Sequence, residues 1–291
     1  MDKVEQRTGG RVKFERIYGG TLSNLSNDPE SIKDGVFDCG QISYVYSPGL
    51  YPLGTVTTLP FIEDDTTVWA HAAHELIKTT PELQAEFAAL NQHYLFTWAI
   101  EPMDFSSYYK ITKLEDFQGL KVRVHGGAAL VAAKLGWVGV SVPWEEIAVA
   151  AANHVVDVIC ASVPVTSRDA GLASIMPYYI PFKVYQFHFA TVMNLDKWNS
   201  IPADLQAIIT ECSDEAVDDA LAYLAGQIGQ GLKDIAAAGM ETVDWPASET
   251  ERAKELAGAP VWADWVVEMN GMGLPGQKIL DRFQELLAAN R

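Results

Sequence analysis

The sequence predicts an α/β fold with mostly parallel sheets, because strand-like and helix-like segments alternate along the chain. Its 291 residues are enough for two domains of ordinary size, each with its own core. Apolar residues keep helical spacing from Pro202 to about Ala238, which predicts a helix of roughly 37 residues and about 55 Å. Because one small domain is narrower than that, we expect this helix to lie across both domains and connect them.

The elements expected before residue 112 follow from local signals. Strands are predicted where apolar residues alternate or cluster, at Arg11–Ile17, 37–45, 93–100 and 108–111. Helices are predicted at 28–35, with an Asp cap and a Pro in the first turn, and at 64–78 and 80–90. Asp64 and Asp65 are expected to cap the second of these helices, and Thr80 the third.

The segment from Leu114 to Gly127 is the most informative part of the chain. It predicts a short helix, a tight turn at Gly119 and a strand that contains Arg123. In a protein with a net charge of −17, an arginine inside an apolar strand is costly to bury unless it holds an anion. The alternative is a partly buried arginine that pairs with an Asp or Glu of the same chain.

The remaining elements continue the same alternation. Residues 142–159 predict a capped helix that leads into an apolar strand, and 186–194 predict another strand. After the long helix, two terminal helices are expected at about 248–268 and 274–289.

Composition excludes several classes of function. Lys and Arg number 21 against 38 Asp and Glu, so nucleic-acid binding and binding to an anionic membrane surface are disfavoured. No run approaches the roughly 18 apolar residues of a membrane span, and the polar first ten residues are not a signal peptide. Cys39 and Cys160 lie in apolar strand-like contexts typical of buried free thiols, and with Cys212 they leave the compartment undecided.

Enzyme motifs are absent from the sequence. It has no G-x-S-x-G elbow, phosphate-binding loop or G-x-G-x-x-G after a strand. His71, His74 and Glu75 fall within one helical turn, a spacing that a metal could use, although a polar helix face is the favoured interpretation. No cofactor or metal is expected.

Several ordered motifs resemble those of solute-binding proteins of tripartite ATP-independent periplasmic (TRAP) transporters, the DctP-type family. Leu114-Glu-Asp-Phe-Gln-Gly-Leu-Lys-Val-Arg-Val124 is similar to the family signature DLKGLKIRVPG. Further similarities, in chain order, are Gly19-Gly-Thr-Leu22, Leu59-Pro-Phe61, Val142-Pro-Trp-Glu-Glu-Ile147 with Val155-Val-Asp157, and Trp198-Asn-Ser-Ile-Pro-Ala-Asp-Leu-Gln206. The resemblance covers essentially the whole chain.

The resemblance implies a two-lobed periplasmic-binding-protein fold with hinge connections and a long helix that spans both lobes. Lobe I is expected at 1–100 plus 187–225, and lobe II at 101–186 plus 226–291. It implies an exported periplasmic protein, expected to be a monomer, that delivers a ligand to the membrane subunits of a TRAP permease. In the family, the arginine at the position of Arg123 forms a bidentate salt bridge with the ligand carboxylate, as suits a planar guanidinium.

The chain also departs from the family pattern. His125-Gly126-Gly127 replaces the proline after the arginine strand, and Ser162 is a weak substitute for an asparagine that helps hold the carboxylate. A basic residue often present upstream is not found around 98–105, which argues against a ligand rich in charge or hydroxyls. By the resemblance, Met1–Gly10 corresponds to the end of the first helix, so a signal peptide and a first strand would precede it.

These observations predict a binding protein, not an enzyme, for a small monocarboxylate with an apolar or aromatic body. The ligand-binding residues are expected to be Arg123, His125, Gly126, Gly127, Trp144, Ser162, Phe61, Tyr46 and Phe187. Two alternatives remain open. One is an aromatic cage for a zwitterionic or quaternary amine solute, and the other is a metal-dependent hydrolase that uses His71, His74 and Glu75.

Overall fold

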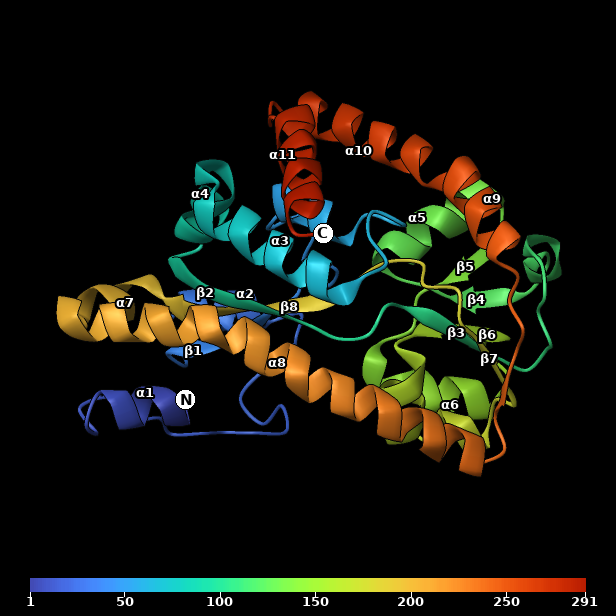
Figure 1. Ribbon diagram of the computed structural model, residues 1–291, viewed down its shortest axis with the longest axis horizontal. Helices are drawn as coiled ribbons and strands as arrows, with labels where there is room; N and C mark the ends of the chain where they lie inside the picture. The colour runs from blue at the N-terminus through green and yellow to red at the C-terminus, as the bar shows by residue number, and fades with distance from the viewer.

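The computed structural model describes residues 1–291 and has two lobes, each built on one sheet (Figure 1). The first lobe contains a three-stranded sheet in the order β1-β8-β2. Its elements are α1 (Asp2–Arg7), α2 (Asp28–Lys33), β1 (Cys39–Ile42), η1 (Leu53–Thr58), α3 (Thr66–Thr79), α4 (Pro81–Ala89), β2 (Gln92–Ala99), β8 (His188–Asn194) and α7 (Leu195–Ser200).

The second lobe contains a six-stranded sheet in the order β5-β4-β6-β3-β7-β9. Its strands are β3 (Asp104–Ser107), β4 (Lys121–Arg123), β5 (Val138–Val140), β6 (Val158–Ala161), β7 (Tyr178–Ile180) and β9 (Glu241–Thr242). Its helices are η2 (Leu114–Phe117), α5 (Gly126–Leu135), η3 (Trp144–Glu146), α6 (Ile147–Ala152), η4 (Val163–Ser167), η5 (Leu172–Ser174), α9 (Ala247–Ala257) and α10 (Ala259–Gly271).

The α/β class is confirmed, with sheets that are more mixed than expected. In the second sheet, β4 runs parallel to β5 and β6, and β7 parallel to β9. The antiparallel pairs all involve β3 or β8, the strands that the chain enters directly from the other lobe. These two strands therefore run against their neighbours.

Three connections join the lobes. Residues 100–103 and 181–187 cross between the sheets side by side, with hydrogen bonds from Met103 N to Tyr185 O at 2.8 Å and from Val184 N to Met103 O at 2.8 Å. The third is α8 (Ala203–Ala237), which packs against β2 in one lobe and η4 in the other and extends along the molecule (Figure 1). The predicted lobe-spanning helix is thus confirmed.

The last helix, α11 (Gly276–Ala289), packs against α3 and η1 of the first lobe. Arg282 of α11 forms an ion pair with Glu75 of α3 at 3.6 Å. We propose that the predicted lobe boundaries apply with α11 counted in lobe I. The first of the two expected terminal helices is divided into α9 and α10 at Gly258, which is followed by Pro260 near the start of α10.

Two predicted strands are wrong. Arg11–Ile17 forms no strand, because no neighbouring strand pairs with its backbone. The strand expected at 108–111 lies earlier, at β3, whose polar side chains are buried and hydrogen-bonded, for example Ser106 Oγ to Ser167 Oγ at 2.9 Å. Of the expected caps, Asp65 caps α3 by accepting from Thr67 N and Val68 N. The Asp cap expected for α2 is wrong, because Asn27 takes the N-cap position and makes no side-chain capping bond. Thr80 takes the N-cap position of α4, but its side chain makes no capping hydrogen bond.

No helix is both long enough and apolar enough to cross a membrane. The three cysteines are free, with Cys160 and Cys212 buried and Cys39 half-buried.

Candidate functional site

Arg123 is the last residue of β4, at the end of the strand that faces the other lobe, and its side chain is 1% exposed. Nε donates to Val142 O at 3.1 Å, and Nη1 donates to Cys160 O at 3.0 Å. Nη2 has no hydrogen-bond partner in the protein, and it is not fully buried, so a ligand can reach it. The guanidinium is held by backbone carbonyls on one side and keeps free donors on the other.

No Asp or Glu side chain forms an ion pair with Arg123 within 4.0 Å. The alternative that Arg123 pairs with an acid of its own chain is therefore wrong. A buried cation without a counter-charge is unfavourable, and the planar fork of donors fits a carboxylate. The arrangement can accept a small anion.

His125 extends the site with a neutral imidazole. Burial, and secondarily the charge of Arg123, hold the pKa of His125 well below its ordinary value. The hydroxyl of Tyr185 lies 2.5 Å from His125 Nδ1, and burial raises the pKa of Tyr185 well above its ordinary value. With the Tyr185 hydroxyl as the donor to Nδ1, the imidazole proton is on Nε2 and remains a donor.

Two aromatic rings, one from the first lobe and one from the end of the crossing segment, lie near this imidazole. The ring of Tyr46 lies 6.0 Å from that of His125, and the ring of Phe187 lies 5.7 Å from it. Tyr46 and Phe187 also contact each other edge to face at 6.3 Å. Four residues from both lobes and the crossing segment thus form one aromatic group beside Arg123: Tyr46, His125, Tyr185 and Phe187.

Gly126 and Gly127 begin α5, which leaves their backbone N–H groups outside the helical hydrogen bonds. A Cβ on Gly127 would lie 2.5 Å from Thr58 O, and one on Gly126 would lie 2.9 Å from Val45. Gly126 also has a φ of +51°. Only glycine lets the start of α5 lie this close to the first lobe, where its dipole favours an anion.

Ser162 directly follows β6, two residues after Cys160, whose carbonyl accepts a hydrogen bond from Arg123. It is 2% exposed, and its hydroxyl hydrogen-bonds to Thr166. Close to it lies Glu101, a residue that the sequence does not single out. Glu101 is 3% exposed and accepts a hydrogen bond from Val165 N at 2.9 Å. A buried acid in an irregular crossing segment leaves no periodic pattern that would have predicted its position beside Ser162.

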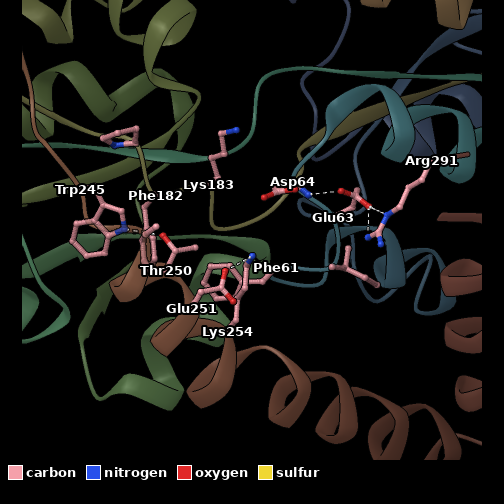
Figure 2. Close-up of a pocket in the computed structure, with 13 residues that line it drawn as sticks. Phe61, Glu63, Asp64, Phe182, Lys183, Trp245, Thr250, Glu251, Lys254 and Arg291 are labelled. Atoms are coloured by element: carbon pink, nitrogen blue, oxygen red, sulfur yellow. Dashed lines mark hydrogen bonds and ion pairs between the residues drawn. The ribbon is translucent and has the colours of Figure 1, made fainter. Parts of the chain in front are cut away.

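Phe61 and Trp144 are not part of this contact group. Trp144 is half-buried in η3 and packs against a core cluster of the second lobe. Phe61 lines a separate cavity of about 350 Å³, shown in Figure 2, whose lining includes Phe61, Phe182, Lys183, Trp245, Lys254 and Arg291. Charged groups there pair with one another, Glu63 with Arg291 at 2.8 Å and Glu251 with Lys254 at 3.0 Å. Arg123 does not line this cavity.

The three residues considered for a metal site do not converge. Each contacts a different partner: His71 contacts Asp218 at 3.2 Å, His74 contacts Tyr94 at 2.8 Å, and Glu75 contacts Arg282 at 3.6 Å. No group of three or more His, Cys, Asp or Glu side chains is placed to hold one metal ion. The geometry does not favour the hydrolase alternative.

Comparisons with known proteins identify a matching family and similar folds. The sequence model of bacterial extracellular solute-binding protein family 7 (DctP) matches residues 1–268. The monocarboxylate 2-oxoacid-binding periplasmic protein of Nostoc sp. (strain PCC 7120) is 25% identical over 263 residues, which cover 88% of this chain and 71% of that protein.

Two solved structures share the fold over nearly the whole chain. A TRAP periplasmic solute-binding protein from Desulfovibrio salexigens DSM2638 superposes with a TM-score of 0.84 at 26% identity, covering 98% of this chain and 88% of that one. A TRAP solute-binding protein from Rhodoferax ferrireducens T118, solved with copurified benzoate, gives a TM-score of 0.89 at 24% identity and covers 100% of this chain and 91% of that one.

Proposed function

Because the chain belongs to family 7 of the bacterial extracellular solute-binding proteins, we propose that it binds a small organic monocarboxylate through Arg123. The single observation that carries this proposal is the buried guanidinium, which is 1% exposed and has no acidic partner in the chain. A bound carboxylate supplies the missing counter-charge and accepts two parallel hydrogen bonds. His125 Nε2 and the N–H groups at the start of α5 are further donors.

The body of the ligand is proposed to be apolar or aromatic. Tyr46, Phe187 and the edge of His125 form the wall that faces it, and such rings favour stacking or edge contacts. Related proteins support an acid ligand: the Nostoc relative is named for monocarboxylate 2-oxoacids, and the Rhodoferax protein was solved with benzoate. A quaternary amine is disfavoured, because the unpaired charge of Arg123 repels a cation.

Binding is proposed to close the two lobes about the crossing segments and α8, without catalysis. The contact group contains residues of both lobes, so a ligand that touches them is bound more tightly in the closed state and shifts the equilibrium toward it. We place the protein outside the cytoplasm, where it would deliver its ligand to the membrane subunits of a TRAP permease. The name of the family supports that location.

A ligand screen tests the proposal. Protein refolded from denaturant, to remove ligand carried over from the host, is titrated by calorimetry with benzoate, phenylacetate, pyruvate and hexanoate, and with glycine betaine and choline. We expect at least one of the acids to bind and the two amines not to bind. Binding of choline or betaine without binding of any acid would refute the proposal and favour the aromatic cage.

A further inference from the structure

Glu101 is a buried acid without a cationic partner. It lies in the crossing segment between β2 and β3, is 3% exposed, and forms no salt bridge within 4.0 Å. One carboxylate oxygen, Oε1, accepts from Val165 N at 2.9 Å. The backbone N–H of Glu101 and the Ser162 hydroxyl also lie near this carboxylate and favour its ionised form. Because an ionised carboxylate has about four acceptor sites, it can accept a further hydrogen bond from a ligand.

Glu101 and Arg123 both form hydrogen bonds with the backbone of residues 160–165. The pairing of Asp104 with Ala161 places the crossing segment alongside the residues that follow β6. Arg123 donates a hydrogen bond to Cys160 O, and Glu101 accepts one from Val165 N. Ser162 lies between Cys160 and Val165 in the sequence. The two opposite charges therefore lie at one end of β6, where the lobes face each other.

No cation of the protein forms an ion pair with Glu101. Burial raises the pKa of Glu101, although its own backbone N–H, the Val165 N–H, the Ser162 hydroxyl and the charge of Arg168 oppose that shift. Arg168 directs its guanidinium to Asp169 instead, at 2.7 Å. A buried acceptor left in this state is costly unless a ligand donor meets it.

We propose that Glu101 accepts a hydrogen bond from the ligand, so that the cleft selects acids that carry a hydroxyl or N–H donor in addition to the carboxylate held by Arg123. The inference rests on the proposed function and narrows it to one class of acids. A donor-free acid would desolvate the remaining acceptor sites of Glu101 without supplying a donor, whereas a hydroxy acid would supply one. Hydrogen bonds to charged groups are strong enough for a preference of about tenfold to a hundredfold.

Pairs of acids that differ only in a hydroxyl group test the proposal. Mandelate is compared with phenylacetate, and 3-hydroxybenzoate with benzoate, by calorimetry on the wild type, Glu101→Gln and Glu101→Ala. Glutamine keeps the shape of the side chain and can still accept from Val165 N, so Glu101→Gln is expected to fold even if Glu101→Ala does not. Glu86→Gln is the matched control, because Glu86 is another buried acid that accepts backbone hydrogen bonds, from Leu53 N and Gly54 N, outside the site.

In at least one pair, the wild type and Glu86→Gln are expected to bind the hydroxy acid about tenfold or more tightly than its partner. Both Glu101 variants are expected to lose that preference and to keep their affinity for the donor-free acid. If acids bind without any preference, or if the preference survives in both Glu101 variants, the role of Glu101 is wrong while the proposed function stands. If no acid binds the wild type, both proposals fail.

Discussion

Replacing Gly231 by alanine tests how α8 is packed against the second lobe. A Cβ at this position would lie 2.4 Å from Pro164 O and 2.7 Å from Pro164 C, both backbone atoms of η4. Overpacking of this kind costs about 1–3 kcal/mol, which exceeds the gain of about 0.5–1 kcal/mol from replacing a glycine inside a helix. The expected net effect is a loss of up to about 2.5 kcal/mol in the free energy of unfolding.

Gly229→Ala is the matched control, because nothing lies within 4 Å of a Cβ built there. It should gain about 0.5–1 kcal/mol from helix propensity alone. Urea denaturation followed by circular dichroism measures both variants. The reasoning is refuted if Gly231→Ala is as stable as Gly229→Ala, since the close approach of α8 to Pro164 would then be absent. The added Cβ would also lie 3.2 Å from Val165 N, which donates to Glu101, so the Gly231 variant should weaken ligand binding as well.

Two further predictions concern capping and pH. Asp65→Ala removes the side chain that caps α3 and should lower the free energy of unfolding by about 1 kcal/mol; an unchanged urea midpoint would contradict that role. Asp104 accepts hydrogen bonds from Tyr179 Oη and Lys183 N, and burial raises its pKa from 3.8 to about 7. Between these values the folded state binds more protons than the unfolded state, so this group makes stability fall as pH rises from about 4 to about 7. Asp104→Asn should flatten that part of the curve of unfolding free energy against pH, and a slope equal to that of the wild type would contradict the assignment.

Strong local patterns made much of the fold predictable. The apolar spacing from Pro202 to Ala238 matches α8, at Ala203–Ala237, almost to the residue. Gly119, with a φ of +78°, forms the expected turn before β4. The strand predicted at Arg11–Ile17 failed because alternation alone does not supply a pairing partner. The early start of β3 was missed because its buried polar residues find hydrogen-bond partners far away in sequence, as Asp104 does with Tyr179.

The site was predictable only in part, because some of its residues come together only in the tertiary fold. Arg123 was conspicuous because a cation in an apolar strand violates the usual pattern, and its neighbours His125 to Gly127 were found with it. Tyr46 and Phe187 come together with His125 only through the tertiary fold. Glu101 carries no pattern of its own, and it becomes significant once its burial and the absence of a cationic partner are known.

The most direct test of the central claim is the affinity of Arg123 variants for the tightest acid found in the screen. Calorimetry should show a loss of at least about a hundredfold for Arg123→Ala, because two charge-assisted hydrogen bonds disappear. Arg123→Lys should lose at least about tenfold, because an ammonium group cannot form the bidentate pair. Arg252→Ala, which removes a surface arginine paired with Glu115, should bind like the wild type. An Arg123→Ala protein that folds and binds the acid with wild-type affinity would contradict the account.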